Sequence, residues 1–268
     1  MANSVKRLIS ILLLLFLAPI VIATLQTPLS TEQVIERKNE DIPIVYAAQI
    51  DAKPKVEVAA EVIPPKKALI YFTHWQEAFK PILAAKGEKI ATYHQETNIS
   101  AFEDQISAQF AFHQLEADFL EVDKPFEIKN YTHIRPYVKN AIENNSYDFI
   151  IDIHRDAAKG SITTLQVGEE KYAKVIFVIG KEHPNHKWNE EIAKAVSDEM
   201  NRLVPGISRG TLPKSGRGVD GVYNQDLDKN SMLLELGGPD NTEIELNRTI
   251  AILAKALSNV FNEQQLTS

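Results

Sequence analysis

The sequence of 268 residues contains no cysteine, and it has no excess of positive charge. Without disulfides, the fold must be held by a hydrophobic core, which a domain of sufficient size can provide. Binding to nucleic-acid phosphates usually needs a basic surface, whereas this chain has a formal net charge of −7. We therefore expect no nucleic-acid partner and favour a substrate that is neutral or of mixed charge.

Long hydrophobic runs are absent except near the N-terminus, where one follows the basic pair Lys6 and Arg7. This uncharged run, Leu8 to Leu25, has about eighteen residues, which is at the lower limit for crossing a hydrocarbon core of roughly 30 Å. It is also longer than most signal-peptide cores. Residues 1–25 are therefore predicted to be a signal-anchor or transmembrane helix, with a cleaved export signal as the alternative. The positive-inside rule then places the rest of this single-pass cell-membrane protein outside the cytoplasm.

Residues 26–67 have no sustained apolar period and are rich in Glu, Lys, Ala and Pro, including Pro54, Pro64 and Pro65. Such a composition is typical of an extended linker, so we expect a flexible extracytoplasmic tether. The remaining residues, 68–268, are enough for one α/β domain. The sequence therefore predicts an anchor, a tether and one folded domain, in that order.

From Ala68 onward, apolar runs of strand length alternate with segments of helical periodicity. This alternation predicts a single three-layer α/β domain with a mostly parallel central sheet flanked by helices. The expected strands are 68–72, 117–122, 149–153, 174–179 and 231–236. The expected helices are 77–85, 100–115, 134–144, 188–203 and a terminal helix that Asn241 caps and that runs through Phe261.

Three of these strands lead to a residue that can bind a metal or transfer a proton. His74 follows the first strand, His154 follows residues 149–153, and Glu235 lies in the last strand. Because the carboxyl ends of parallel strands lie at the same edge of a sheet, we expect these three side chains to meet there. This is the layout of a zinc hydrolase.

His74 and Glu77 are three residues apart, so they can face one ion from a strand end and the next helical turn. His154 supplies a third ligand, and the open fourth position of a tetrahedral site would hold water, as catalytic zinc requires. We therefore predict one Zn²⁺ ion bound by His74, Glu77 and His154. Asp152 or Asp156 could orient a ligand imidazole through a hydrogen bond.

Glu235 interrupts an apolar strand and is followed by Gly237 and Gly238. A buried carboxylate without a partner costs several kcal/mol, so Glu235 needs a partner or a function. As a functional group, it would take a proton from the attacking water and pass it to a leaving amine, with a raised pKa suited to both steps. The structural alternative is an ion pair with Arg155 or Arg248.

Three further polar residues each allow two interpretations. Arg155 could bind a substrate carboxylate, or it could pair with an internal Asp. Asn224 and Gln225 could bind glycan or peptide amides in the cleft, or they could form a turn. The sequence leaves these alternatives open.

A second pair with three-residue spacing, His183 and His186, lies in the polar loop 181–187. It lacks the adjoining carboxylate and the helical context of zinc sites that contain two such histidines. We therefore expect a solvated loop here rather than a second metal site.

The candidate residues lie in four short motifs. These are Thr73-His74-Trp75-Gln76-Glu77-Ala78-Phe79, Asp152-Ile153-His154-Arg155-Asp156-Ala157, Tyr223-Asn224-Gln225, and Leu234-Glu235-Leu236-Gly237-Gly238 with Asn241-Thr242. In this order they resemble motifs of the stage II sporulation protein P family, whose first motif is Thr-His-Thr-x-Glu-x-Tyr. The resemblance covers nearly all of residues 68–256 and includes the anchor and tether. Trp75 and Gln76 stand where small hydroxyl residues are common.

This resemblance implies a membrane-anchored, zinc-dependent N-acetylmuramoyl-L-alanine amidase with a fold similar to other zinc amidases of this kind. It implies that His74, Glu77 and His154 bind the zinc and that Glu235 is the catalytic acid/base. It further implies degradation of peptidoglycan during engulfment of the forespore, with a lytic transglycosylase and a membrane scaffold as partners. Peptidoglycan is then the expected substrate, and the N-terminal helix is the expected attachment to the cytoplasmic membrane.

Two other functions stay open. The same residues could cleave an amide of the stem peptide or its cross-links, which would make the protein a zinc endopeptidase. The fold could also serve as a non-catalytic cell-wall-binding scaffold. A scaffold of that kind is expected to have lost a ligand or the acid, whereas His74, Glu77, His154 and Glu235 are all present.

Overall fold

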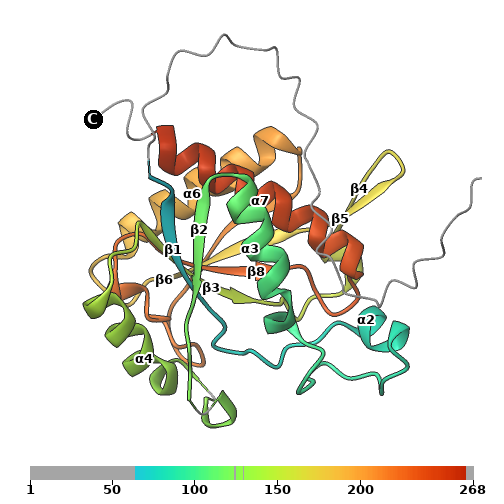
Figure 1. Ribbon diagram of the computed structural model, residues 1–268, viewed down its shortest axis with the longest axis horizontal. Coiled ribbons are helices and arrows are strands. Elements are labelled where there is room, and N and C mark those ends of the chain that lie inside the picture. Colours follow the sequence, from blue (N-terminus) through green and yellow to red (C-terminus); the bar gives the residue numbers. More distant parts are fainter. Residues whose placement is uncertain (1–63, 124, 129, 264–268) are drawn as a thin grey trace, which may run out of the picture. The chain divides into compact units, whose positions relative to one another are not determined.

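The computed structural model of the protein describes residues 64–123, 125–128 and 130–263 (Figure 1). The predicted anchor and most of the predicted tether lie outside these residues and stay predictions. Within the described part of the chain, no helix is both long and apolar enough to cross a membrane. The first strand begins at Lys66, two residues before the expected start.

A six-stranded sheet forms the centre of the described region, in the order β2-β1-β3-β8-β6-β7. Each neighbouring pair is parallel except β6 and β8, which are antiparallel. A separate antiparallel hairpin joins β4 to β5. The strands are β1 (Lys66–Tyr71), β2 (Leu115–Phe119), β3 (Phe149–His154), β4 (Thr164–Val167), β5 (Glu170–Ala173), β6 (Val175–Gly180), β7 (Ser208–Lys214) and β8 (Ser231–Leu236).

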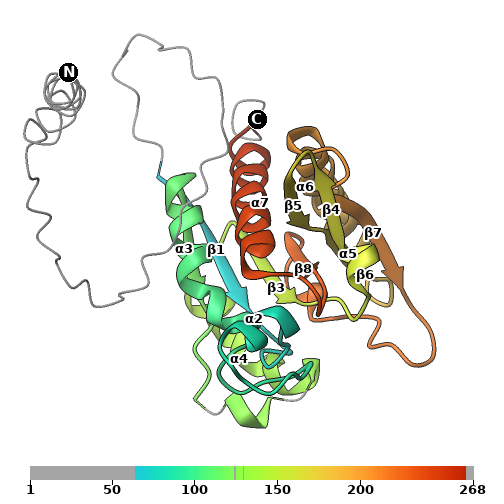
Figure 2. The ribbon, with the colours of Figure 1, turned by 90° about the vertical axis from the view of Figure 1, so that its right-hand side faces the viewer.

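Helices cover both faces of this sheet. Figure 2 shows α7 between α3 and α6, and α4 lies apart from these three. The described helices are α2 (Lys80–Ala85), α3 (Glu103–Phe112), α4 (Tyr131–Asn144), α5 (Gly160–Thr163), α6 (His186–Leu203) and α7 (Glu243–Glu263), with short 3₁₀ turns η1 (Ile99–Phe102), η2 (Pro125–Glu127) and η3 (Gln225–Leu227). The predicted three-layer α/β fold with a mostly parallel sheet is therefore confirmed.

Alternation along β1 shows how the strands divide their side chains between the two layers. Ala68 and Ile70 pack in the core under α3, α6 and α7, whereas Leu69 and Tyr71 pack on the other face, against α4. Both faces are therefore buried, which explains why the central strands read as continuous apolar runs.

Several expected elements have different bounds. The helix expected over residues 100–115 begins as the turn η1 and ends at Phe112 of α3, because Leu115 already begins β2. The helix predicted from residue 77 begins only at Lys80, with Pro81 in its first turn, where a missing N–H costs nothing. Glu77 instead forms an isolated antiparallel bridge with Tyr93. Strand β2 begins at Leu115, two residues before the expected start.

Candidate metal centre

Three adjacent parallel strands bring the candidate residues to one edge of the sheet. β1, β3 and β8 are neighbours, so their carboxyl ends point the same way. His74 lies three residues beyond β1, and His154 is the last residue of β3. Glu235 of β8 lies in register with His154. The backbone register therefore places a carboxylate beside the second histidine.

His74, Glu77 and His154 form a cluster with one ligand atom from each within 4.8 Å of the others. The two Glu77 oxygens lie 3.8 Å from Nδ1 of His74 and 3.8 Å from Nδ1 of His154. Ligands about 2.0–2.1 Å from a tetrahedral zinc lie roughly 3.3–3.4 Å apart, so side-chain shifts of about half an ångström for the 3.8 Å contacts, and of up to about 1.4 Å for the widest pair, would close the site. The three residues fit a metal of this kind.

The Glu77 carboxylate is held by the main chain of β3. Its Oε2 accepts a 2.7 Å hydrogen bond from the backbone N–H of Arg155, and the backbone N–H of Glu77 donates to the carbonyl of His74. Burial raises the pKa of Glu77, and the charge of His154 and the Arg155 hydrogen bond oppose this rise without cancelling it. A cation at this point would relieve the cost of burying the carboxylate.

Asp152 lies directly behind His154. Its Oδ2 is 3.0 Å from Nε2 of His154, although the ring N–H is not aligned with it, so the contact is electrostatic rather than a well-formed hydrogen bond. Thr73 fixes this carboxylate by donating its backbone N–H to Oδ1 at 3.0 Å and its hydroxyl to Oδ2 at 2.7 Å. Nδ1 of His154 is thereby left to face Glu77.

The pKa values of the two histidines are shifted in opposite directions. Burial lowers the pKa of His154, but Asp152 and then Glu77 and Glu235 more than offset this and raise it to about 9. Burial and the neighbouring charge of His154 lower the pKa of His74. A metal that binds this cluster would have to displace a proton from His154.

The environment of the Glu235 carboxyl group favours its protonated form. Burial raises its pKa to about 7, and the charges of Glu77 and Asp156 add to this, whereas His154 and Arg155 oppose it. Within the described part of the chain, no group donates a hydrogen bond to this carboxylate. A carboxyl group with this pKa can both accept and donate a proton near neutral pH.

The ion-pair partners considered for Glu235 are engaged elsewhere. The Arg155 guanidinium donates to the carbonyls of Asp156 at 2.9 Å and Thr92 at 3.0 Å. Arg248 forms an ion pair with Glu170 at 3.3 Å. Arg155 therefore supports the cluster through its backbone N–H, which donates to Glu77, whereas its guanidinium hydrogen-bonds to the two carbonyls.

Asp156 lies at the same sheet edge but is not directed at the histidines. Its Oδ1 accepts a 2.8 Å hydrogen bond from Ala158 N–H, and its Oδ2 forms an ion pair with Arg209. Of the two aspartates, the structure places only Asp152 against a ligand imidazole.

The side-chain amides of Asn224 and Gln225 form hydrogen bonds within the protein. Asn224 accepts from Arg135 Nη1 at 3.0 Å and donates to the carbonyl of Tyr131 at 2.9 Å. Gln225 accepts from Gly180 N–H at 2.8 Å and donates to the carbonyl of Val178 at 2.7 Å. Both side chains are buried, and Asn224 has a left-handed backbone with φ of 56°. Asn224 therefore supports the start of α4, and Gln225 holds the end of β6.

Tyr131 is a member of the site that the sequence did not indicate. It is the first residue of α4, and its ring centroid lies 5.7 Å from His74 and 6.0 Å from His154. Burial and the charges of Asp152 and Glu235 raise the pKa of its phenol far above the usual value, so the hydroxyl stays a donor. The sequence signal is weak, because only the cap Asn130 marks this helix start.

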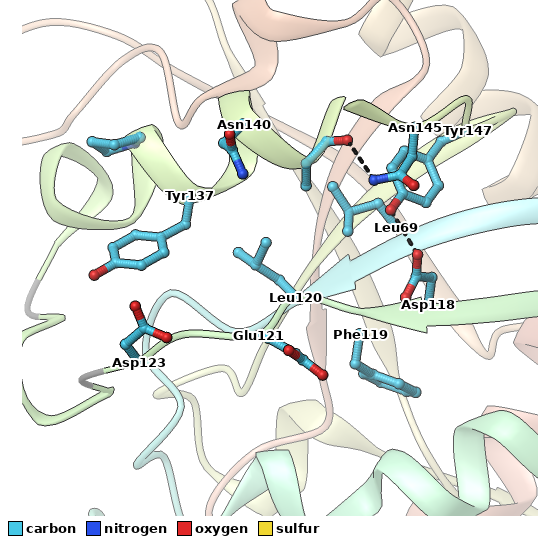
Figure 3. Close-up of a pocket in the computed structure, with 12 residues that line it drawn as sticks. Leu69, Asp118, Phe119, Leu120, Glu121, Asp123, Tyr137, Asn140, Asn145 and Tyr147 are labelled. Atoms are coloured by element: carbon cyan, nitrogen blue, oxygen red, sulfur yellow. Dashed lines mark hydrogen bonds between the residues drawn. The ribbon is translucent and has the colours of Figure 1, made fainter. Parts of the chain in front are cut away.

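Two of the hollows near these strands differ in whether a residue of the cluster lines them. One of about 330 Å³ includes His74 in its lining. The other, of about 570 Å³, lies between β2 and α4 (Figure 3), where the Tyr147 hydroxyl donates a 2.6 Å hydrogen bond to Asp118. None of the cluster residues lines this second hollow, so the smaller one adjoins the metal centre.

Comparison with solved structures shows weak similarity to amidases. The CwlD amidase from Clostridioides difficile, in complex with the GerS lipoprotein, matches with a TM-score of 0.48 and 15% identity, over 74% of this chain and 98% of that one. The N-acetylmuramyl-L-alanine amidase Ami1 from Mycobacterium smegmatis matches with a TM-score of 0.46 and 10% identity, over 75% and 99% of the two chains. Similarity at this level carries no information about activity.

Comparison with known sequences is more informative. The chain is 32% identical over 232 residues to the stage II sporulation protein P of Bacillus subtilis strain 168, which covers 81% of this chain and 57% of that relative. It therefore spans little more than half the length of the curated relative. The model of the family described as "Stage II sporulation protein P (SpoIIP)" matches residues 27–258. Because this match takes in most of the sequence, the chain belongs to the stage II sporulation protein P family.

Proposed function

We propose that the chain is a zinc-dependent N-acetylmuramoyl-L-alanine amidase, which hydrolyses the amide between N-acetylmuramic acid and L-alanine in peptidoglycan. The observation that carries this proposal is the convergence of His74, Glu77 and His154 with Glu235 in register beside them. Membership of a sporulation family supports a role in that process.

His74, Glu77 and His154 would hold the ion, and two imidazoles with one carboxylate suit zinc. When bound, zinc would polarise the scissile carbonyl and lower the pKa of water. Asp152 would keep the His154 ring oriented, and the Arg155 N–H would keep the Glu77 carboxylate in place.

Glu235 performs the proton transfer in this proposal. Its carboxylate takes a proton from the attacking water and delivers it to the nitrogen of the leaving L-alanine. A pKa of about 7 suits both steps, because the group then accepts and releases a proton at little cost near neutral pH. The Tyr131 hydroxyl, which stays protonated, would donate a hydrogen bond to a substrate oxygen.

Analysis of digested peptidoglycan by mass spectrometry tests the proposal. The full-length protein should release stem peptides with a free L-alanine N-terminus and leave lactyl ends on the sugars, and a chelator should stop this reaction until zinc is restored. New peptide ends on stems still attached to sugar would instead identify an endopeptidase. Zinc binding without any hydrolysis would identify a scaffold.

The cellular setting belongs to the same proposal. We infer a single-pass protein of the cell membrane, held by residues 1–25 with its catalytic domain outside the cytoplasm. It would act on peptidoglycan in forespore engulfment, with a lytic transglycosylase and a membrane scaffold as partners. Fractionation and external protease digestion of intact cells would test this placement, since a cytoplasmic fraction containing the whole protein would contradict it.

A further inference from the structure

We propose that the hollow beside His74 is a subsite for a neutral sugar ring of the glycan strand, with Trp75, Tyr93 and Phe126 as its aromatic wall. This inference deepens the proposed function and rests on it for the identity of the substrate. The hollow has a volume of about 330 Å³, at the lower end of the range of small-molecule sites. Its lining consists of Thr73, His74, Trp75, Gln76, Tyr93, Phe126 and Ile128.

The hollow adjoins the metal cluster through His74. The residues from Thr73 to Gln76 follow β1 directly and form one side of it. Any group bound there lies next to the ion that His74 would hold. A substrate cleaved at the metal would therefore place a neighbouring part of its chain in this hollow.

Two large aromatic side chains are exposed on this surface. Tyr93 is 62% exposed and Phe126 is 67% exposed. Exposed aromatic groups gathered in a hollow next to a catalytic cluster are typical of ligand binding, whereas scattered ones are not. A pyranose ring has a face of C–H groups that packs against such rings and a rim of hydroxyls that reaches polar neighbours.

A hydrogen bond and ring contacts hold these aromatic side chains in place. The Trp75 indole N–H donates a 3.0 Å hydrogen bond to the carbonyl of Pro125, and its ring meets Phe126 edge-on, with centroids 5.4 Å apart. The Arg155 guanidinium lies 6.0 Å from the centre of the Tyr93 ring. Rings fixed in this way lose little conformational freedom when a ligand binds.

The charge of the lining favours sugar over stem peptide. Apart from His74 and the Tyr93 phenol, none of the described lining residues is titratable. A stem peptide carries carboxylates, which call for a cation, but the nearby Arg155 guanidinium already donates to two carbonyls. The Gln76 side chain hydrogen-bonds to no described residue, so it is free to bind a hydroxyl or acetamido group.

Intrinsic fluorescence offers a direct test, because the chain has only two tryptophans, Trp75 and Trp188. The full-length protein carrying Trp188→Phe and Glu235→Gln would be titrated with a peptide-free oligomer of N-acetylglucosamine. We expect Trp75 emission to change with oligomer concentration until it reaches a plateau. The double change Tyr93→Leu and Phe126→Leu should weaken this binding roughly tenfold or more, since two stacking contacts are lost.

Phe112→Leu is the matched control, because Phe112 is 55% exposed at the end of α3 and lies outside the hollow. It should leave glycan binding unchanged, and all variants should keep the same unfolding temperature. A sugar-free stem peptide should bind the Leu double variant as well as it binds the parent. Loss of peptide binding in the double variant, with glycan binding intact, would overturn the proposal and identify a peptide subsite.

The outcomes for subsite and function are distinguishable. Peptidoglycan hydrolysis by the native protein, without any response of Trp75 to the oligomer, would end the sugar-subsite proposal and leave the amidase proposal standing. Saturable glycan binding without hydrolysis would support the sugar subsite and end the amidase proposal.

Discussion

Two pairs of residues with the same spacing, His74 with Glu77 and His183 with His186, have very different surroundings. The first lies beyond β1, at the edge where β3 brings His154 to the cluster. The second follows β6, which runs antiparallel to β8 and therefore ends at the opposite edge of the sheet. Identical spacing thus gives a candidate metal cluster here only where a parallel neighbouring strand adds a third side chain that can bind a metal.

The second pair also corrects an expectation. His183 was expected in a solvated loop, but it is only 7% exposed, and neither ring nitrogen makes a well-aligned hydrogen bond to a described residue. Asp226 lies close enough to affect its charge, but both Asp226 oxygens accept hydrogen bonds from Arg135 at 2.7 Å. The carboxylate that could complete a site here is already paired.

The largest effect should come from removing a ligand of the first pair's cluster. His154→Ala should lose both the zinc ion and hydrolytic activity, because two remaining ligands hold zinc poorly. His183→Ala should keep one zinc per chain. Elemental analysis and peptidoglycan hydrolysis, measured on the same samples, check this. Zinc retained by His154→Ala and lost by His183→Ala would exchange the roles of the two regions.

Glu235→Gln should keep the zinc and lower turnover by about 10²- to 10⁴-fold, the usual contribution of a proton-transferring group. The amide keeps the shape of the side chain but cannot accept the proton. Metal content and initial rate, measured together, separate this residue from the ligands. A variant with normal turnover would show that another group moves the proton.

Asp152→Asn should weaken zinc binding by about 10- to 100-fold, the usual effect of losing a carboxylate behind a ligand histidine. Asp156→Asn is the control, because Asp156 contacts Ala158 and Arg209 rather than a histidine. Competition with a fluorescent chelator gives both affinities. Equal losses in the two variants would contradict the distinction drawn between these aspartates.

The smallest effect concerns pH and the second pair. Burial lowers the pKa of His183, and His186 and Lys181 add to this, while Asp226 and a contact with Gly180 oppose it. The unfolded chain, with a histidine pKa near 6.5, therefore binds more protons as the pH falls below that value. The contribution of His183 to stability should therefore decrease from pH 7.5 to 5.5, whereas the raised pKa values of His154 and Glu235 act in the opposite direction.

His183→Gln should remove this contribution, so the free energy of unfolding at pH 5.5, relative to that at pH 7.5, should be higher in the variant than in the parent. His133→Gln, at an exposed position of α4, serves as the control and should leave the difference unchanged. The same difference in the His183 variant as in the parent would show that His183 does not contribute.

Strands with continuous apolar sequence were predictable. All six residues of β3 are buried, so its apolar run and the polar residues at its end could be recognised without a structure. β7 lies at the sheet edge and is mostly half-buried, and its Gly210 and Pro213 interrupt any apolar run. The hairpin β4–β5 is largely exposed and gave no pattern either.

The site was predictable only where its residues follow strands. His74, His154 and Glu235 share a sheet edge because of strand direction, which the apolar runs indicate. Tyr93 lies in an isolated bridge and Phe126 in the short 3₁₀ turn η2, and no periodicity relates them to β1. Their proximity to His74 depends on how the connecting segments fold over the sheet, and residue spacing in the sequence does not predict this.

The hydrogen bond that holds Glu77 has an evolutionary consequence. Its donor is the main-chain N–H of residue 155, so nineteen of the twenty amino acids can supply it there, and proline alone cannot. Arg155 can therefore change over generations without releasing the Glu77 carboxylate. Replacing the buried Arg155 side chain would remove its hydrogen bonds to the carbonyls of Asp156 and Thr92, but the Glu77 carboxylate would keep its main-chain donor.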